Sequence, residues 1–182
     1  VKKLILNALT TGYLMELSHH LLRLILLEEL KPDINLLHKK RMMPGLAVVL
    51  VGDNEESKIY VKHKLRVAEN LGVHVFPVFL PKDTMEKTLL AKITNLNNDA
   101  RVNGIIVQLP LPKHIDTHKV IDAIDPEKDV DGFHPLNSGK LMLERDSLVP
   151  CTPMAVVMLL KHFVKPDLSG FKVAVIGRSM IV

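Results

Sequence analysis

The sequence has few of the features that mark secreted, membrane-spanning or nucleic-acid-binding proteins. Its single cysteine, Cys151, rules out an internal disulfide and indicates a reducing compartment. Tryptophan is absent, aromatic residues make up 4% of the chain, and no zinc-finger or RNA-binding motif occurs, so we expect no nucleic-acid partner. The densest leucine run, residues 21–30, is interrupted by Arg23, Glu28 and Glu29, so we expect no membrane span.

What is present is typical of a globular protein with a packed core. Hydrophobic residues make up 47% and charged residues 24% of the 182 residues, a length that allows one domain or one domain plus part of another. The net charge of +4 would suit an anionic small substrate. The N-terminal stretch has no acidic residue before Glu16, so it is either an amphipathic helix packed on the domain or the remnant of an organelle-targeting segment. We therefore expect a cytoplasmic or mitochondrial protein.

Strand-like and helix-like segments alternate along the chain with short joints, which predicts an α/β fold with a parallel sheet. The strand-like runs are 46–51, 74–80, 104–109 and 172–177, and the helix-like runs are 54–71, 84–97, 117–124 and 154–163. A boundary is expected near residues 147–153, where Thr152 and Pro153 are typical of an N-cap followed by the first helical position. We therefore predict one domain over 1–148 and the start of a second over 149–182.

The helix predicted at 54–71 places a lysine on its apolar side. Asp53 and Glu56 have the spacing of a capping box at its start. On a helical wheel the charged side chains gather on one arc, whereas Tyr60 and Lys64 fall among the apolar residues opposite. An ammonium group on that side loses hydration and needs polar partners or gives up its proton more readily, as a catalytic lysine must. The alternative is a lysine whose stem covers apolar surface while its amine reaches water.

Two further polar groups stand next to apolar segments. Gln108 lies at the end of the strand-like run 104–109, which places it at the carboxyl end of a parallel strand, where ligands bind in such sheets. Its amide could bond a lysine or a heterocycle, or only cap a loop. Asp129 and Asp131 lie in a turn before Gly132, where they could bind a metal, accept hydrogen bonds from a guanidine-like ring, or act as ordinary turn residues. The turn offers too few oxygen ligands for a divalent metal.

The remaining motifs are weaker on their own. His114 and His118 have the i, i+4 spacing of a helical metal pair, but no third ligand accompanies them, so we expect no metal site. The run 172–177 ends in Gly177, and a strand that ends in glycine and turns towards a helix is how a dinucleotide-binding domain begins. Arg178 is placed either to meet a phosphate or to lie at the surface.

Five segments in this order and spacing carry a family resemblance: 52–64, 104–112, 125–132, 150–153 and 175–179. Together they resemble the methylenetetrahydrofolate dehydrogenase/methenyltetrahydrofolate cyclohydrolase family of bifunctional folate enzymes. The resemblance implies a three-layer α/β catalytic domain with a parallel sheet, followed by a Rossmann domain of which this chain holds the first helix and strand. Folate would bind in the cleft between the two domains.

The resemblance also assigns roles to residues of this chain. It implies that Lys64 is the acid/base lysine, that Tyr60 stacks on the pterin, and that Gln108 adjusts the charge state of the lysine. Asp131 would hold the amino-pyrimidine edge of the substrate, and Leu109 would contact the substrate.

The activity implied by the resemblance needs a nicotinamide cofactor. Such enzymes oxidise 5,10-methylenetetrahydrofolate to 5,10-methenyltetrahydrofolate, usually with NADP and in some cases with NAD, and hydrolyse the product to 10-formyltetrahydrofolate. Thr152, Gly177, Arg178 and Ser179 match positions near the cofactor, with Arg178 near the 2′-phosphate. We expect the complete protein to be a homodimer.

The chain departs from the family pattern in three places. Residues 6–30 lack the expected Asp-Gly-Lys-type opening, Ala155 stands where glycine is usual, and the chain stops at Val182 inside the nucleotide-binding loop. We therefore expect no dehydrogenase activity from this chain alone, and residual cyclohydrolase at most. The competing hypothesis is a truncated folate-binding or partner-binding module without hydride transfer. A generic α/β nucleotide-binding protein is disfavoured because it does not explain Gln108 and Asp131.

Overall fold

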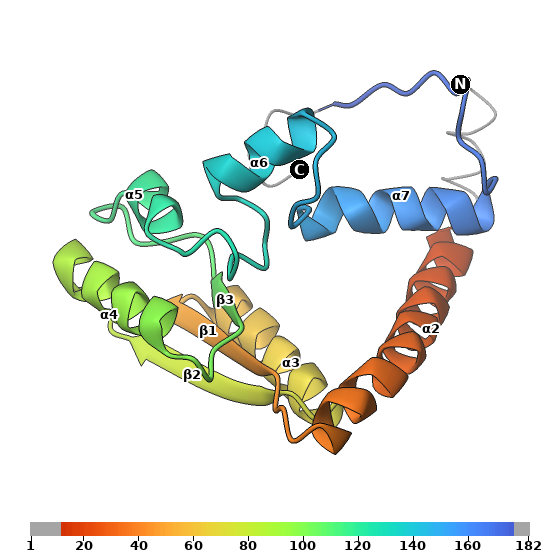
Figure 1. The fold of residues 1–182 in the computed structure, drawn as a ribbon. Coiled ribbons are helices and arrows are strands. Elements are labelled where there is room, and N and C mark those ends of the chain that lie inside the picture. Colours follow the sequence, from red (N-terminus) through yellow and green to blue (C-terminus); the bar gives the residue numbers. More distant parts are fainter. Residues whose placement is uncertain (1–11, 177–182) are drawn as a thin grey trace.

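The computed structural model describes the backbone of residues 12–176 and the side chains of residues 26–176. Helices and strands alternate through most of this range, as the sequence predicts (Figure 1). The elements are α2 (Gly12–Lys39), β1 (Gly45–Val51), α3 (Glu55–Asn70), β2 (His74–Leu80), α4 (Glu86–Asn98), β3 (Gly104–Val107), α5 (Thr117–Asp122), α6 (Pro135–Met142) and α7 (Cys151–Phe163).

The three strands form one parallel sheet in the order β2-β1-β3, which confirms the predicted fold class. β1 runs through the middle, with Gly45 opposite His74 on one side and Leu46 opposite Gly104 on the other. β3 is two residues shorter than the predicted run 104–109. The pairing with β1 nevertheless continues for one more hydrogen bond, because the backbone N–H group of Gln108 donates to the Val49 carbonyl at 2.8 Å.

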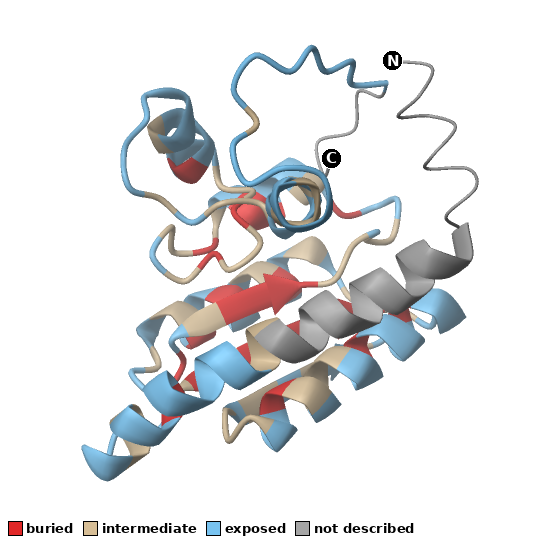
Figure 2. Ribbon diagram, turned by 90° about the vertical axis from the view of Figure 1, so that its right-hand side faces the viewer, coloured by how far each residue is buried: buried red, intermediate tan, exposed pale blue. Residues whose placement is uncertain are grey.

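Helices cover both faces of this sheet and make three layers. On one face, Val61 of α3 packs against alternate side chains of β1 and β3. On the other face, Leu89 and Ile93 of α4 and Val120 of α5 complete the larger core. The buried residues are concentrated in β1 and β3 and on the inward sides of the covering helices (Figure 2), whereas the edge strand β2 has none. The position of α3 is therefore set by its packing against the sheet.

The start of α3 differs in detail from the prediction. The side-chain oxygen of Asn54 accepts a hydrogen bond from the Ser57 amide at 2.8 Å, so Asn54 is the N-cap. The capping box predicted from Asp53 and Glu56 is therefore wrong. Asn and Asp are equally good N-cap residues. Asn54 is the N-cap because its side chain, rather than that of Asp53, reaches a free backbone N–H group of the first turn.

Two local predictions for residues 149–177, the N-cap at Thr152 and the strand at 172–177, are wrong. α7 begins at Cys151 with Pro150 at the N-cap position, so Thr152 is not an N-cap. Pro153 lies in the first helical turn. Backbone N–H groups there have no acceptor within the helix, so the N–H group that proline lacks costs no hydrogen bond. The strand predicted at 172–177 is not formed over residues 171–176. A strand needs a neighbour for its backbone groups, and the sheet β2-β1-β3 presents no partner to this run.

The N-terminal helix α2 contacts the rest of the described structure near its carboxyl end. Ile34 is buried, and the Nε2 atom of His38 lies 2.8 Å from the Gly72 carbonyl oxygen. Leu30 and Leu36, in contrast, are about half exposed. The prediction of a helix is thus confirmed, but the packing of its described side chains is local. Across the helices that the structure describes, none combines the length and apolar character needed to cross a bilayer.

We predict that Leu89→Ala lowers the free energy of unfolding by about 2–5 kcal/mol, because the side chain is fully buried between α4 and the sheet. Leu143→Ala is the matched control, since Leu143 is 66% exposed, and it should change stability by less than about 0.5 kcal/mol. Urea denaturation followed by circular dichroism measures both. Equal losses for the two variants would contradict the assigned core.

Candidate active site

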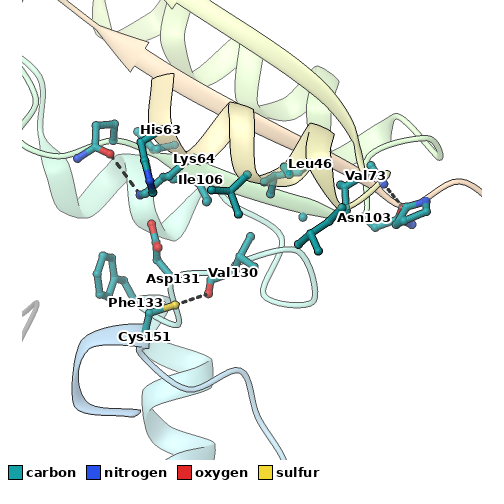
Figure 3. Close-up of a pocket in the computed structure, with 18 of the residues that line it drawn as sticks. Leu46, His63, Lys64, Val73, Asn103, Ile106, Val130, Asp131, Phe133 and Cys151 are labelled. Atoms are coloured by element: carbon teal, nitrogen blue, oxygen red, sulfur yellow. Dashed lines mark hydrogen bonds between the residues drawn. The ribbon is translucent and has the colours of Figure 1, made fainter. Parts of the chain in front are cut away.

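A cleft of about 760 Å³ lies on the α3 side of the sheet, along β3. The 130–133 turn and the first residues of α7 form its opposite wall (Figure 3). Most of its polar side chains lie near the carboxyl end of β3, whereas apolar side chains and Asn103 line the end near the start of β1 and β3. The polar group contains His63, Lys64, Gln108, Asp131 and Thr152, and the apolar group contains Leu46, Val67, Leu71, Val73 and Ile106.

Lys64 and Gln108 meet in this cleft, as their positions in the sequence predict. The Lys64 Nζ atom donates to the Gln108 Oε1 atom at 3.2 Å, and Lys64 is half-buried. The Gln108 Nε2 atom donates to the Leu109 carbonyl at 2.8 Å, which orients the amide with its oxygen towards the lysine. Gln108 therefore both caps the loop after β3 and binds the lysine. It supplies an acceptor without adding a negative charge.

Asp131 faces Lys64 from the other wall of the cleft (Figure 3). Within the described part of the chain, no backbone or side-chain group donates a hydrogen bond to its carboxylate. Burial raises the pKa of this carboxyl, the positive charge of Lys64 opposes the rise, and the negative charge of Asp129 adds to it. A half-buried carboxylate with open acceptor positions is suited to bind the N–H groups of a ligand.

The two aspartates of the turn have different environments. Asp129 is 1% exposed, and its Oδ2 atom accepts hydrogen bonds from the His134 amide at 2.8 Å and from Asn137 Nδ2 at 3.0 Å. Asp129 is thus a buried structural residue, whereas Asp131 is open to the cleft. Within residues 26–176, no three His, Cys, Asp or Glu side chains are grouped so that they could hold a metal ion.

Tyr60 corrects the helical-wheel prediction. It is 64% exposed and does not line the cleft, although Leu109 and Thr152 do. The buried side of α3 is narrow and follows Ser57, Val61 and Ala68. Tyr60 lies about 60° from Ser57 on the wheel, on the side away from Val61, and so falls outside this stripe. Its ring is accessible at the helix surface one turn before Lys64.

The cofactor residues predicted at Gly177, Arg178 and Ser179 lie outside the described residues. Sequence reasoning missed Phe133 as a lining residue and Asn137 as the buried partner of Asp129. Phe133 follows the Asp-Gly turn, which was a usable signal. Nothing in the sequence marks Asn137, because its role depends on a contact eight residues away.

Comparison with known proteins accounts for this arrangement. The family model described as the catalytic domain of tetrahydrofolate dehydrogenase/cyclohydrolase matches residues 20–131, which is more than half of the chain. The chain belongs to the tetrahydrofolate dehydrogenase/cyclohydrolase family. The match includes α3, the sheet and the turn that carries Asp131, so the family resemblance stated from the sequence is confirmed.

Individual relatives in this family support the assignment. The bifunctional protein FolD of Ruminiclostridium cellulolyticum is 50% identical over 153 residues, which cover 84% of this chain and 54% of the relative. The crystal structure of the bifunctional enzyme FolD, a methylenetetrahydrofolate dehydrogenase/cyclohydrolase from Campylobacter jejuni, aligns with a TM-score of 0.78 and 42% identity. That alignment covers 81% of this chain and 52% of the C. jejuni chain.

A third family member was solved with ligands. The N5,N10-methylenetetrahydrofolate dehydrogenase-cyclohydrolase of Trypanosoma brucei, complexed with NADP cofactor and an inhibitor, aligns with a TM-score of 0.72 and 36% identity. The alignment covers 75% of this chain and 47% of the T. brucei chain. The chain thus spans about half the length of the relatives it matches.

We predict that Asp131→Asn stabilises the fold at neutral pH. Because burial raises the pKa of Asp131 above its ordinary value of 3.8, the folded state holds more protons than the unfolded state between that value and the raised pKa. The free energy of unfolding therefore falls as the pH rises from 3.8 through the raised pKa of Asp131. Asparagine cannot ionise, so the variant does not lose this stability. Urea denaturation at pH 3.5 and pH 7 should show a larger gain at pH 7. If the difference in unfolding free energy between Asp131→Asn and the wild type is the same at pH 3.5 and at pH 7, the assigned burial of Asp131 is contradicted.

The thiol of Cys151 should report the charges of the cleft. Burial and the charge of Asp131 raise the pKa of Cys151, and Lys64 lowers it. Since the thiolate is the reactive form, Asp131→Asn should speed disulfide exchange with an aromatic disulfide reagent, and Lys64→Met should slow it. The chain has no other cysteine, so the rate refers to one site. Changes in the same direction for both variants would show that these charges do not act on Cys151.

Proposed function

We propose that this chain forms the folate-binding catalytic part of a bifunctional enzyme of one-carbon metabolism. The enzyme oxidises 5,10-methylenetetrahydrofolate to 5,10-methenyltetrahydrofolate and hydrolyses the product to 10-formyltetrahydrofolate. The observation that carries this proposal is the Lys64–Gln108 pair, which faces the open carboxylate of Asp131 across the cleft. The names of the relatives support the same two reactions.

The proposed roles follow from the geometry of the cleft. Asp131 accepts hydrogen bonds from the amino-pyrimidine edge, which places the one-carbon unit near Lys64. Lys64 moves a proton to and from the water that attacks the methenyl carbon, and Gln108 holds the amine in place through its oriented amide. The exposed ring of Tyr60, one turn before Lys64 on α3, stacks on the pterin from outside the lining of the cleft, and Leu109 supplies apolar contact.

The oxidation requires a nicotinamide cofactor, which supplies the hydride acceptor when it is bound. Thr152 fits a role beside such a group because it lines the cleft at the start of α7. We assign Gly177, Arg178 and Ser179 to the phosphate-binding loop, with Arg178 favouring NADP over NAD through the 2′-phosphate. The T. brucei relative, solved with NADP, is consistent with this preference. A folate-binding module without hydride transfer would keep the cleft and lose only the oxidation.

We predict that Lys64→Met lowers cyclohydrolase turnover by about 10²–10⁴-fold in the full-length protein, because it removes the only proposed proton-transfer group. Lys62→Met is the matched control on the same helix, since Lys62 is exposed and lies outside the cleft. The assay follows the hydrolysis of 5,10-methenyltetrahydrofolate, and circular dichroism checks the fold of both variants. Turnover retained in Lys64→Met would remove Lys64 from its role.

A further inference from the structure

Asp129 is a costly residue for a purely structural position. Among the side chains that the structure describes, it is the only charged one that is fully buried, and none of the recorded ion pairs includes it. A buried carboxylate without a cation is unfavourable unless hydrogen bonds compensate for its lost hydration. A neutral amide at this position could accept the same hydrogen bonds at lower cost. The negative charge therefore needs a separate explanation.

Asp129 organises the turn that carries Asp131 through both its backbone carbonyl and its carboxylate. The Gly132 amide donates to the Asp129 carbonyl at 3.1 Å, which closes the turn with Asp131 at its third position. Beyond the turn, the His134 amide donates to Asp129 Oδ2 at 2.8 Å and ties the start of α6 to the same residue. Both sides of Asp131 are thus attached to Asp129.

Asn137 completes the support from inside α6. It is 2% exposed, and its Nδ2 group donates both to the Pro126 carbonyl at 2.8 Å and to Asp129 Oδ2 at 3.0 Å. Both amide hydrogens are therefore used to join the segment before the turn to the turn itself. The Ile105 amide donates to the Lys128 carbonyl at 2.7 Å, which anchors this unit to the edge of β3.

Gly132 fixes the other side of the turn. Its φ of +69° is in the region that favours glycine, and a Cβ atom there would lie 2.7 Å from the Pro150 nitrogen. The turn is therefore held between β3, α6 and the segment that leads into α7. Asp131 is the one carboxylate of this unit that is free to face Lys64.

We propose that Asp129 is a positioning residue for the folate reaction: its buried carboxylate, held by Asn137 and the His134 amide, aims Asp131 at the substrate and adds a negative charge behind it. This inference rests on the proposed function, because it concerns how Asp131 binds folate. The charge of Asp129 also acts on Asp131 directly and raises the pKa of that carboxyl.

The test uses two substitutions that separate geometry from charge. Asp129→Ala removes the two hydrogen bonds that the carboxylate accepts from the His134 amide and from Asn137. It should weaken binding of 5,10-methenyltetrahydrofolate to the full-length protein by about tenfold or more. In the Asp131→Asn background the same change should have less than about a twofold effect, because the residue acts through Asp131. Equal losses in the two backgrounds would overturn the proposal. Asp122→Asn, an exposed carboxylate on α5, is the control and should bind as the wild type does.

Asp129→Asn keeps an oxygen acceptor for both donors and removes only the charge, so it also serves if Asp129→Ala does not fold. Its folate affinity at neutral pH should stay within about twofold of the wild type. The acid limb of its affinity–pH profile should move to lower pH, because the pKa of Asp131 falls when the nearby charge is removed. An unmoved acid limb would overturn the charge effect that we propose.

Failure of the proposed function would look different. If the wild type and Asp131→Asn bind 5,10-methenyltetrahydrofolate equally poorly, the folate site itself is wrong. If the wild type binds and Asp131→Asn binds measurably more weakly, but the Asp129 variants show no coupling to Asp131, only the positioning role is wrong.

Discussion

The parallel pairing of β1 with β3 is the constraint on which the site depends. It places the carboxyl end of β3, and with it Gln108, beside the face of the sheet that α3 covers. Lys64 then reaches Gln108 over a separation of 44 residues in the chain. The outer edge of β3 also receives the Lys128 carbonyl, so the turn that carries Asp131 is attached to the same strand. β3 thus supplies Gln108 and anchors the wall that carries Asp131, whereas α3 brings Lys64 from the opposite wall.

The charged residues of the cleft act on one another. Lys64 is held by a neutral amide and faces a carboxylate that its surroundings make harder to ionise. A second carboxylate is buried behind the first and is compensated only by hydrogen bonds. A fold selected for stability alone would avoid such a group. The cost is understandable if the hydrogen bonds of this buried carboxylate orient Asp131 in advance for a ligand, because pre-oriented groups need no rearrangement on binding.

Sequence reasoning succeeded where local pattern and chemistry coincide. The alternation of apolar runs predicted the parallel sheet. Of the partners left open for Gln108, the lysine and the loop are both observed, and the lysine is the one that the family resemblance implies. It failed where competing local signals are nearly equal in energy. Asn54 replaced Asp53 as the cap of α3, and Tyr60 lies just outside a buried stripe narrower than the wheel suggested. The strand predicted at 172–177 failed because a β-strand is defined by its neighbour.

By itself, the sequence determined the fold class through apolar periodicity and the family through motifs in a fixed order and spacing, and it named candidate residues for the chemistry. Only the tertiary structure decided which of two aspartates in one turn is open to a ligand and which is buried. Asp129 and Asp131 are two residues apart and chemically identical. Their difference arises from Asn137 and the His134 amide, which α6 brings to one carboxylate and not to the other. The family resemblance could name Asp131 as the substrate residue, but burial and hydrogen bonding are properties of the folded environment, so only the structure gives the physical reason.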